Sequence, residues 1–366
     1  MLEAGTIPSH RYNLAMISRD LTHDGNLHEA ASHFLPLLLP RSTVDRRDPS
    51  PSLRHMIRLP RFASLVCVVC AALVACAFVS PAHAAVSATD DTGATVSLAA
   101  PAQRVISLAP HVTELIYAAG GGAKLVGAVS YSDYPPAAKQ VPRVGDNTAL
   151  DLERIVALKP DLIVVWRHGN AQAQLERLRE LHIPLFFSEP HRLDDIAVTL
   201  TRLGTLLGTS ATADTAASAY RQDIARLRSR YASRPPVSVF YEVWDQPLMT
   251  LNGTHMISDV ITLCGGRNVF AQLAPLVPTV STEAVLAANP EAIVTASAGA
   301  TKTTAPLAKL DPWHAWPSLA AAARNNLFAI DGDLIDRPAP RIAQGAAELC
   351  EDLEVARSRR PAAEAQ

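Results

Sequence analysis

Two matching stretches decide the fold: Asp151-Leu-Glu-Arg-Ile-Val-Ala-Leu-Lys-Pro-Asp-Leu-Ile-Val164 and Ser281-Thr-Glu-Ala-Val-Leu-Ala-Ala-Asn-Pro-Glu-Ala-Ile-Val294. They lie 130 residues apart throughout. Each copy begins with a helix-capping residue and an acid in the first turn, continues as an apolar helix that stops at a proline, and ends in an apolar strand. Two such units in the same order predict two similar lobes, and a chance match of common α/β patterns is the alternative.

A second pair of stretches, Thr113–Gly121 and Ser258–Gly266, supports the duplication, because both have a capping residue, an acid, an apolar turn and a Gly-Gly stop. Short apolar runs without clean alternation surround these pairs, as is typical of strands buried on both faces. The expected strands, with helices between them, cover residues 104–109, 125–129, 161–166, 185–188, 237–243, 292–296 and 327–331. The sequence therefore predicts an α/β protein with two Rossmann-like lobes and parallel sheets.

A long helix is expected between the lobes. Residues 211–233 begin with an Ala-rich run and precede Pro235-Pro236. At 1.5 Å per residue this helix is roughly 30–35 Å long, and it is stiffer than a Gly/Ser linker. Because clefts between domains are favoured small-molecule sites, we expect a ligand between the lobes. The predicted parts are an N-terminal lobe (85–208), the connecting helix (209–234), a C-terminal lobe (235–360) and a disordered tail (361–366).

The apolar run 62–79 predicts a signal peptide over residues 56–84. A basic segment precedes the run, and Ala82-His83-Ala84 follows it as a cleavage signal, so cleavage is expected after Ala84 and export to the periplasm follows. A single membrane anchor is one alternative, and a lipoprotein acylated at Cys76 is another. Residues 1–55 show no sustained periodicity of apolar residues, and we interpret them as a disordered extension upstream of the true translation start at Met56.

Cysteine usage supports the same compartment. Three of the five cysteines lie in the expected signal segment, which leaves Cys264 and Cys350. Two thiols in an oxidising compartment favour one disulfide, worth about 4–5 kcal/mol on a chain-entropy account, over two buried free thiols.

Composition and motifs exclude several classes of function. The formal net charge is −2 with the two signs mixed, which argues against nucleic-acid binding. There is no nucleophile elbow, no phosphate-binding loop, no His-Glu-x-x-His and no cluster of metal ligands. We therefore expect neither an enzyme nor a resident cofactor or metal.

Five segments carry a resemblance to a known family. They are residues 104–115, 130–136, 151–170, 263–270 and 333–341, within a match that extends over nearly all of residues 104–353. They closely resemble the cobalamin-binding branch of the periplasmic binding proteins of ABC importers, the class in which a helix joins two lobes. The segment Trp166-Arg-His-Gly-Asn170 is particular to that branch, whereas the first segment is shared with siderophore and haem binders.

The resemblance implies that a corrinoid binds between the lobes as a transported ligand. It implies that Tyr131 stacks on the ligand, that Trp166 contributes an aromatic contact, and that Asp333 and Arg337 face the amide rim of the corrin. An aromatic face suits the macrocycle, and charged groups suit the rim. The resemblance also implies a disulfide between the two remaining cysteines, Cys264 and Cys350.

The chain departs from the family at two places. Where the family has a tryptophan before each lobe's capped helix, this chain has Asn147 and Val277. Tyr241 and Trp244 are candidates to replace these two aromatic contacts, and packing against the sheet is the alternative.

Glu153 and Glu283 occupy equivalent places in the repeat, and the family uses such a pair to dock on arginines of a dimeric permease. Two like charges in pseudo-symmetric places suit a two-fold partner. The alternative is that each glutamate only favours its own helix N-terminus, worth about 0.3–1 kcal/mol. The partners implied are an inner-membrane permease with its ATPase, and the chain itself is expected to be a monomer.

A ferric siderophore, haem or another metal chelate is the alternative ligand. His111 and His168 lie near strand ends and are candidate metal or haem ligands, although solvated or hydrogen-bonded loop histidines are the simpler interpretation. The absence of a basic cluster for an anionic chelate favours the corrinoid.

Overall fold

The computed structural model describes residues 84–170, 172–297 and 309–361. The expected extension (1–55), all of the expected signal peptide (56–84) except Ala84, and the tail beyond residue 361 lie outside the described residues. Within the described part of the chain, no helix combines the length and the apolar character that crossing a membrane requires.

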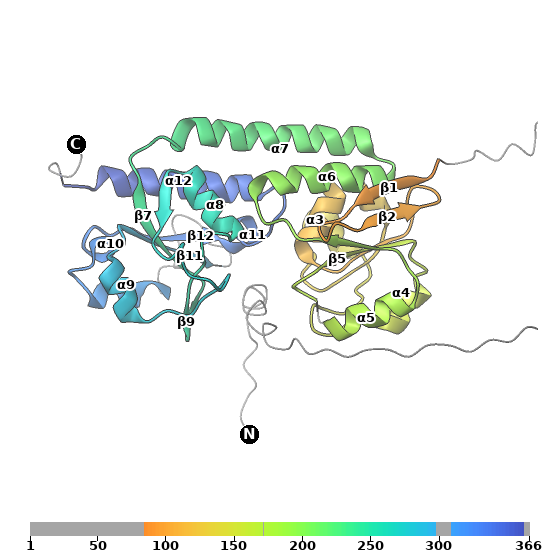
Figure 1. Cartoon of the computed structure of the whole chain (residues 1–366), viewed down its shortest axis with the longest axis horizontal. Coiled ribbons are helices and arrows are strands. Elements are labelled where there is room, and N and C mark those ends of the chain that lie inside the picture. Colours follow the sequence, from red (N-terminus) through yellow and green to blue (C-terminus); the bar gives the residue numbers. More distant parts are fainter. Residues whose placement is uncertain (1–83, 171, 298–308, 362–366) are drawn as a thin grey trace, which may run out of the picture. The chain divides into compact units, whose positions relative to one another are not determined.

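The N-terminal lobe is built on a parallel sheet with the strand order β4-β3-β5-β6 (Figure 1). These strands are β3 (Val105–Ser107), β4 (Leu125–Ala128), β5 (Leu162–Trp166) and β6 (Leu185–Ser188). Its helices are α3 (Pro110–Ala118), η3 (Gly122–Lys124), η4 (Pro136–Gln140), α4 (Leu152–Ala157) and α5 (Gln172–Glu180). A hairpin of β1 (Val86–Thr89) and β2 (Thr95–Leu98), which the sequence analysis missed, precedes the sheet.

The C-terminal lobe has a parallel sheet with the order β10-β7-β11-β12. Its strands, together with a short hairpin of β8 and β9, are β7 (Val237–Glu242), β8 (Trp244–Asp245), β9 (Leu248–Met249), β10 (Gly266–Asn268), β11 (Ala292–Ser297) and β12 (Leu327–Asp331). Its helices are α8 (Met256–Leu263), α9 (Thr282–Ala288), η6 (Asp311–Ala315), α10 (Ala320–Ala323), α11 (Gly332–Ile335) and α12 (Ile342–Ser358). In chain order both sheets run 2-1-3-4, so the two lobes share one topology. The predicted α/β fold with two lobes is confirmed.

The repeated stretches have the same local structure in both lobes. The Asp151 side chain accepts a hydrogen bond from the backbone N–H of Arg154 at 2.9 Å, and Ser281 caps α9 through the N–H of Ala284 at 3.2 Å. Each helix is followed, just before its proline, by a residue with positive φ: Lys159 at 48° and Asn289 at 42°. The chain therefore turns in the same way from helix to strand in both copies.

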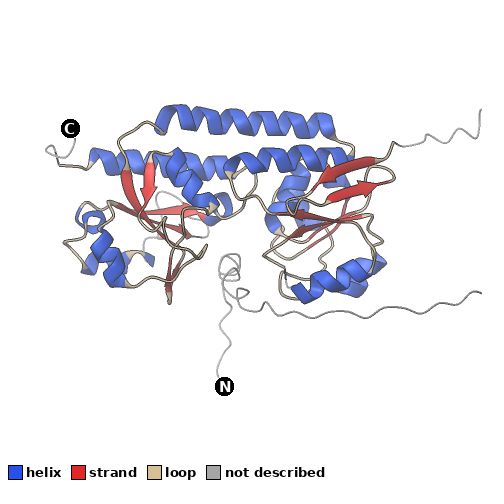
Figure 2. Ribbon diagram, in the orientation of Figure 1, coloured by secondary structure: helices blue, strands red, loops and turns tan. Residues whose placement is uncertain are grey.

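The connecting helix does not stand alone. It is α7 (Ser210–Tyr231), and it packs along α6 (Leu193–Leu207) and against α8 and α12 (Figures 1 and 2). Tyr220 is buried, and its hydroxyl donates to the Leu193 carbonyl at 2.9 Å. A helix held on its neighbours in both lobes keeps those lobes in register better than an isolated rod.

Cys264 and Cys350 form a disulfide, as predicted. Cys264 ends α8, Cys350 lies in α12, and both are fully buried. The equivalent of Cys264 in the other lobe is Ala119, 145 residues earlier, so the bond distinguishes the C-terminal lobe from the N-terminal lobe.

Candidate functional site

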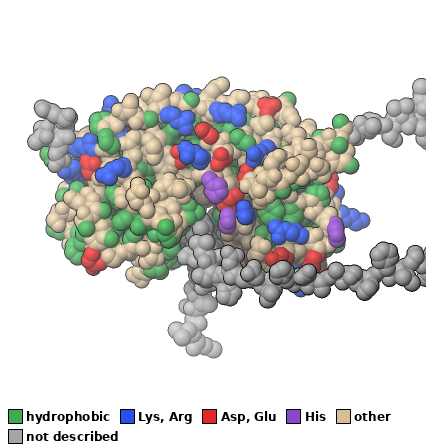
Figure 3. Space-filling model, in the orientation of Figure 1, with side chains coloured by type: hydrophobic (Ala, Val, Ile, Leu, Met, Phe, Trp, Pro, Cys, Tyr) green, Lys and Arg blue, Asp and Glu red, His purple; other side chains and the backbone are tan. Residues whose placement is uncertain are grey.

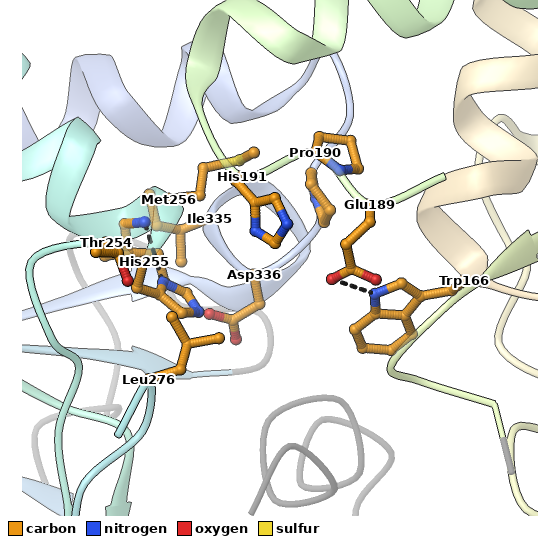
Figure 4. Close-up of a pocket in the computed structure, with 12 residues that line it drawn as sticks. Trp166, Glu189, Pro190, His191, Thr254, His255, Met256, Leu276, Ile335 and Asp336 are labelled. Carbon is orange, nitrogen blue, oxygen red and sulfur yellow. Dashed lines mark hydrogen bonds between the residues drawn. The ribbon is translucent and has the colours of Figure 1, made fainter. Parts of the chain in front are cut away.

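A pocket lies between the lobes, at the carboxyl ends of strands from both sheets (Figure 4). In parallel sheets these ends meet at one edge, where loops can converge on a ligand. The N-terminal lobe contributes the end of β5 and the loop after β6, and the C-terminal lobe contributes the start of α8 and the segment around α11. The described lining residues are Trp166, Glu189, Pro190, His191, Thr254, His255, Met256, Ile257, Leu276, Ile335, Asp336 and Pro338.

Trp166 is held in place by its own segment. The side-chain oxygen of Asn170 accepts from the Trp166 backbone N–H at 3.2 Å, while the Asn170 amide donates to the Leu108 carbonyl at 3.0 Å. The Trp166 indole N–H donates to Glu189 at 3.4 Å, and the ring lies edge-on to His111 with the centroids 5.2 Å apart. The branch-specific segment Trp166–Asn170 therefore positions an aromatic ring at the pocket wall.

The N-terminal wall also carries the acid Glu189, and two histidines lie behind or beside it without lining the pocket. Burial alone would raise the pKa of Glu189, but hydrogen bonding and charge from His168, 3.2 Å away, hold that pKa below its ordinary value. His111 is buried behind Trp166, and desolvation lowers its pKa to about 4. His168 is thus a hydrogen-bonded loop histidine. His111 is not a solvated loop histidine, because it is buried and its lowered pKa keeps it neutral at physiological pH.

The C-terminal wall carries a carboxyl of unusual character. Burial raises the pKa of Asp336 to about 7, although the charge of Lys309 and the hydrogen bond with Tyr241 oppose the shift. The Tyr241 hydroxyl donates to Asp336 at 3.4 Å, and Tyr241 itself is fully buried. The expected direct contact between Tyr241 and a ligand is therefore corrected, because Tyr241 lies behind the wall and supports Asp336.

His255 stands at the start of α8. Its Nδ1 accepts from the backbone N–H of Ile257 at 3.1 Å, which caps the helix. Desolvation, and secondly the nearby His191, lower the pKa of His255 to about 4, so the ring is neutral at physiological pH. In the space-filling view, histidine side chains (purple) are visible near the middle of the face shown and at its right side (Figure 3).

Arg337 is engaged in a buried cluster of ion pairs between the lobes. From the C-terminal lobe it contacts Glu114 at 2.9 Å, Asp133 at 2.8 Å and Asp333 at 2.8 Å. Arg341 adds contacts of 2.6 and 2.9 Å to Glu114. The lobes use these groups for each other, and neither Arg337 nor Asp333 belongs to the described lining of the pocket, so their contact with a ligand stays a prediction.

Tyr131 lies beside Trp166 in a second, smaller hollow. It follows β4 with a positive φ of 64°, and its side chain is 48% exposed. Asn147, which stands where the family has tryptophan, lines the same hollow. The structure thus brings Tyr131 and Trp166 together on one face of the N-terminal lobe.

Trp244 and Val277 do not contribute to the described pocket lining. The Trp244 indole donates to the Gln246 carbonyl at 2.8 Å within the β8–β9 hairpin, and Val277 is buried. The suggestion that Trp244 replaces a missing contact stays a prediction, because its indole N–H is used by its own hairpin and its ring is outside the described pocket lining.

Glu153 and Glu283 are exposed on the first turns of α4 and α9. The pKa of Glu283 is lowered by hydrogen bonds from the backbone and from Ser281. Both glutamates sit at the same position in the repeat, as the sequence requires.

Of the described lining residues, the sequence analysis named only Trp166, and it missed all four with titratable side chains: Glu189, His191, His255 and Asp336. Glu189 and His191 directly follow a predicted strand, so the strand-end rule was enough to find them. His255 and Asp336 carry no such signal, because they reach the pocket from helices.

Residues 105–334 match the periplasmic binding protein family. The chain belongs to this family. A vitamin B12-binding protein of Vibrio cholerae serotype O1 is 38% identical over 257 residues, which are 70% of this chain and 91% of that protein. The crystal structure of the periplasmic vitamin B12-binding protein of Vibrio cholerae matches with a TM-score of 0.64 and 38% identity, over 70% of this chain and 98% of that one.

A periplasmic haem-binding protein of Pseudomonas aeruginosa is also similar, with a TM-score of 0.58 and 27% identity over 68% of this chain and 91% of that one. The relatives described here are thus named for binding vitamin B12 or haem. Among the described residues, no group of three or more His, Cys, Asp or Glu side chains is arranged to hold a bare metal ion.

Proposed function

We propose that this chain binds cobalamin or a related corrinoid between its lobes in the periplasm and delivers it to an ABC permease. The observation that carries the proposal is the pocket at the strand ends of both lobes, with Trp166 on its wall and Tyr131 beside it. The identity to vitamin B12-binding relatives over nine-tenths of their length supports the same ligand.

The chemistry of the pocket suits a corrin. The macrocycle offers a broad apolar face, on which the rings of Trp166 and Tyr131 can pack. Its rim carries amides, each with a donor and an acceptor. His255 supplies an N–H donor, and Asp336, whose pKa is raised to about 7, can donate when protonated or accept when ionised.

Arg337 retains one donor for the ligand. Its Nε is buried, and no hydrogen bond from this atom occurs among the described residues. Buried donors normally have a partner, so an unused N–H beside the pocket supports a contact to a rim carbonyl. The other guanidinium nitrogens stay with Glu114, Asp133 and Asp333.

We further propose that delivery to the permease depends on the exposed pair of glutamates. Glu153 and Glu283 would meet arginines of a two-fold permease that works with its ATPase.

The chain acts as a monomeric carrier without catalytic activity, and the corrinoid is cargo instead of a resident cofactor. Residues 56–84 direct export with cleavage after Ala84, with acylation at Cys76 as the alternative.

Calorimetric titration with cyanocobalamin, haem and a ferric siderophore tests the ligand. We expect saturable binding of cyanocobalamin at one site and much weaker binding of the other two. Preferential binding of haem would contradict the corrinoid as the ligand and would favour haem, for which the Pseudomonas aeruginosa relative is named. Binding of none of the three compounds would remove the proposal.

Charge reversal tests the docking role. The variant carrying both Glu153→Arg and Glu283→Arg should lose cobalamin uptake in cells and stimulation of the permease ATPase, because both contacts become repulsive. Glu180→Arg, which changes an exposed glutamate on α5, is the matched control and should leave uptake unchanged. Normal uptake by the double variant would contradict docking through this pair.

A further inference from the structure

Among the described residues of the pocket lining, one imidazole has no hydrogen-bond or ion-pair partner. His191 follows β6, lines the pocket and is exposed (Figure 4). Within residues 84–170, 172–297 and 309–361, no hydrogen bond or ion pair involves its ring. Its backbone N–H, in contrast, donates to Asp195 at 2.9 Å at the start of α6. The backbone is anchored while the ring remains available to a ligand.

The other lining side chains that could bind a metal already have hydrogen-bond partners or are buried. Glu189 accepts from the Trp166 indole and from His168, and Asp336 accepts from Tyr241. The Met256 side chain is buried. Each of these groups already has a hydrogen-bond partner or is buried, so His191 is the best-placed candidate metal ligand among the described lining residues.

The two pocket histidines differ in tautomer. Because Nδ1 of His255 accepts from the Ile257 N–H, the neutral ring of His255 carries its proton on Nε2. That nitrogen can donate a hydrogen bond, but it has no lone pair for a metal. The ring of His191 has no such constraint, and either nitrogen can serve as a ligand.

We infer that His191 is an axial ligand to the metal of the bound macrocycle, while His255 donates a hydrogen bond to the macrocycle rim. The inference rests on the proposed function and assigns the two imidazoles different roles. Imidazole is a common axial ligand of metal macrocycles, and one such bond needs no cluster of protein ligands.

The chemical step is a ligand exchange. In aquacobalamin the cobalt(III)–oxygen bond to water breaks, a cobalt–nitrogen bond to the neutral His191 ring forms, and the water molecule leaves. No electron is transferred, and cobalt remains trivalent. In cyanocobalamin a tightly bound cyanide occupies the coordination position that water holds in aquacobalamin, so His191 cannot readily replace it.

The absorption spectrum of bound aquacobalamin tests this assignment with the purified full chain. We expect the visible bands to shift on binding, as they do when free imidazole replaces the water. His191→Ala should abolish the shift and lower the ratio of aquacobalamin to cyanocobalamin affinity by about tenfold, which corresponds to about 1.4 kcal/mol. Millimolar imidazole should restore the shift in this variant.

Two variants separate the roles. His255→Ala should weaken both cobalamins but keep the shift, whereas His314→Ala, which removes an exposed histidine of η6, should change neither readout. Tight binding of aquacobalamin by the wild type without a shift, or a shift that persists in His191→Ala, overturns the coordination and leaves the proposed function intact. Failure to bind either cobalamin overturns both.

Discussion

The two lobes share a sheet order and a repeated helix–strand unit, but they present different chemistry to the space between them. The N-terminal lobe contributes aromatic rings and the acids Glu114 and Asp133, whereas the C-terminal lobe contributes Arg337, Arg341 and a carboxyl that is partly protonated at neutral pH. The shared scaffold places Glu153 and Glu283 at equivalent positions, in the first turns of α4 and α9. The difference lies in loops and helix starts, where side chains can change without altering the sheet.

The largest effect is expected from breaking the charge complementarity between the lobes. Glu114→Ala leaves two arginines without their shared, buried carboxylate. Loss of one partner from a buried ion pair costs about 3–5 kcal/mol, so the urea midpoint should fall markedly. Glu180→Ala, which removes an exposed acid, should stay within about 0.5 kcal/mol of the wild type. Equal stability of both variants would show that the cluster contributes little.

A second test removes the disulfide, which among the described residues occurs only in the C-terminal lobe. Replacing Cys264 and Cys350 together by alanine, the residue at the equivalent position 119, should lower the free energy of unfolding by about 2–5 kcal/mol. Urea titrations with and without a reductant measure the effect. The reductant should destabilise the wild type and leave the double variant unchanged. A wild type insensitive to full reduction would refute this contribution.

The pH dependence of stability should have opposite signs in the two lobes. Between about pH 4 and 7 folded Asp336 holds a proton that the unfolded chain has released, so its contribution to stability falls as pH rises. His111, whose folded pKa is about 4 against 6.5 in the unfolded chain, lacks a proton that the unfolded chain takes up. Its contribution therefore rises with pH over about pH 4 to 6.5.

Two variants isolate these contributions. Asp336→Asn should gain stability relative to the wild type by about 2–4 kcal/mol between pH 4.5 and 8, and His111→Gln should show the opposite slope below pH 6.5. Urea unfolding at several pH values gives both differences. A pH-independent difference for Asp336→Asn would contradict the raised pKa.

The smallest effect concerns the aromatic face of the N-terminal lobe. Trp166→Ala should weaken cyanocobalamin binding about tenfold, because stacking on the macrocycle is lost. Trp244→Ala, in the hairpin of the other lobe, should change the affinity less than twofold. Calorimetry measures both. A larger loss for Trp244 than for Trp166 would reverse the assignment of the aromatic wall.

The sequence by itself determined the duplicated architecture, every strand of the two parallel sheets except β10, the disulfide and the equivalence of Glu153 and Glu283. These features depend on periodicity, capping residues and a repeat, which are local along the chain. The strand β10 escaped because three polar and small residues carry no pattern of their own.

Only the tertiary structure decided which polar groups meet. Glu114 and Arg337 are 223 positions apart, and nothing local indicates that they pair. In the same way, Tyr241 is buried because its strand lies inside the sheet, and the pKa of Asp336 is raised by its own burial between elements that are distant in sequence. Charge pairing and desolvation depend on distances across the folded molecule, and a linear pattern of residues does not contain those distances.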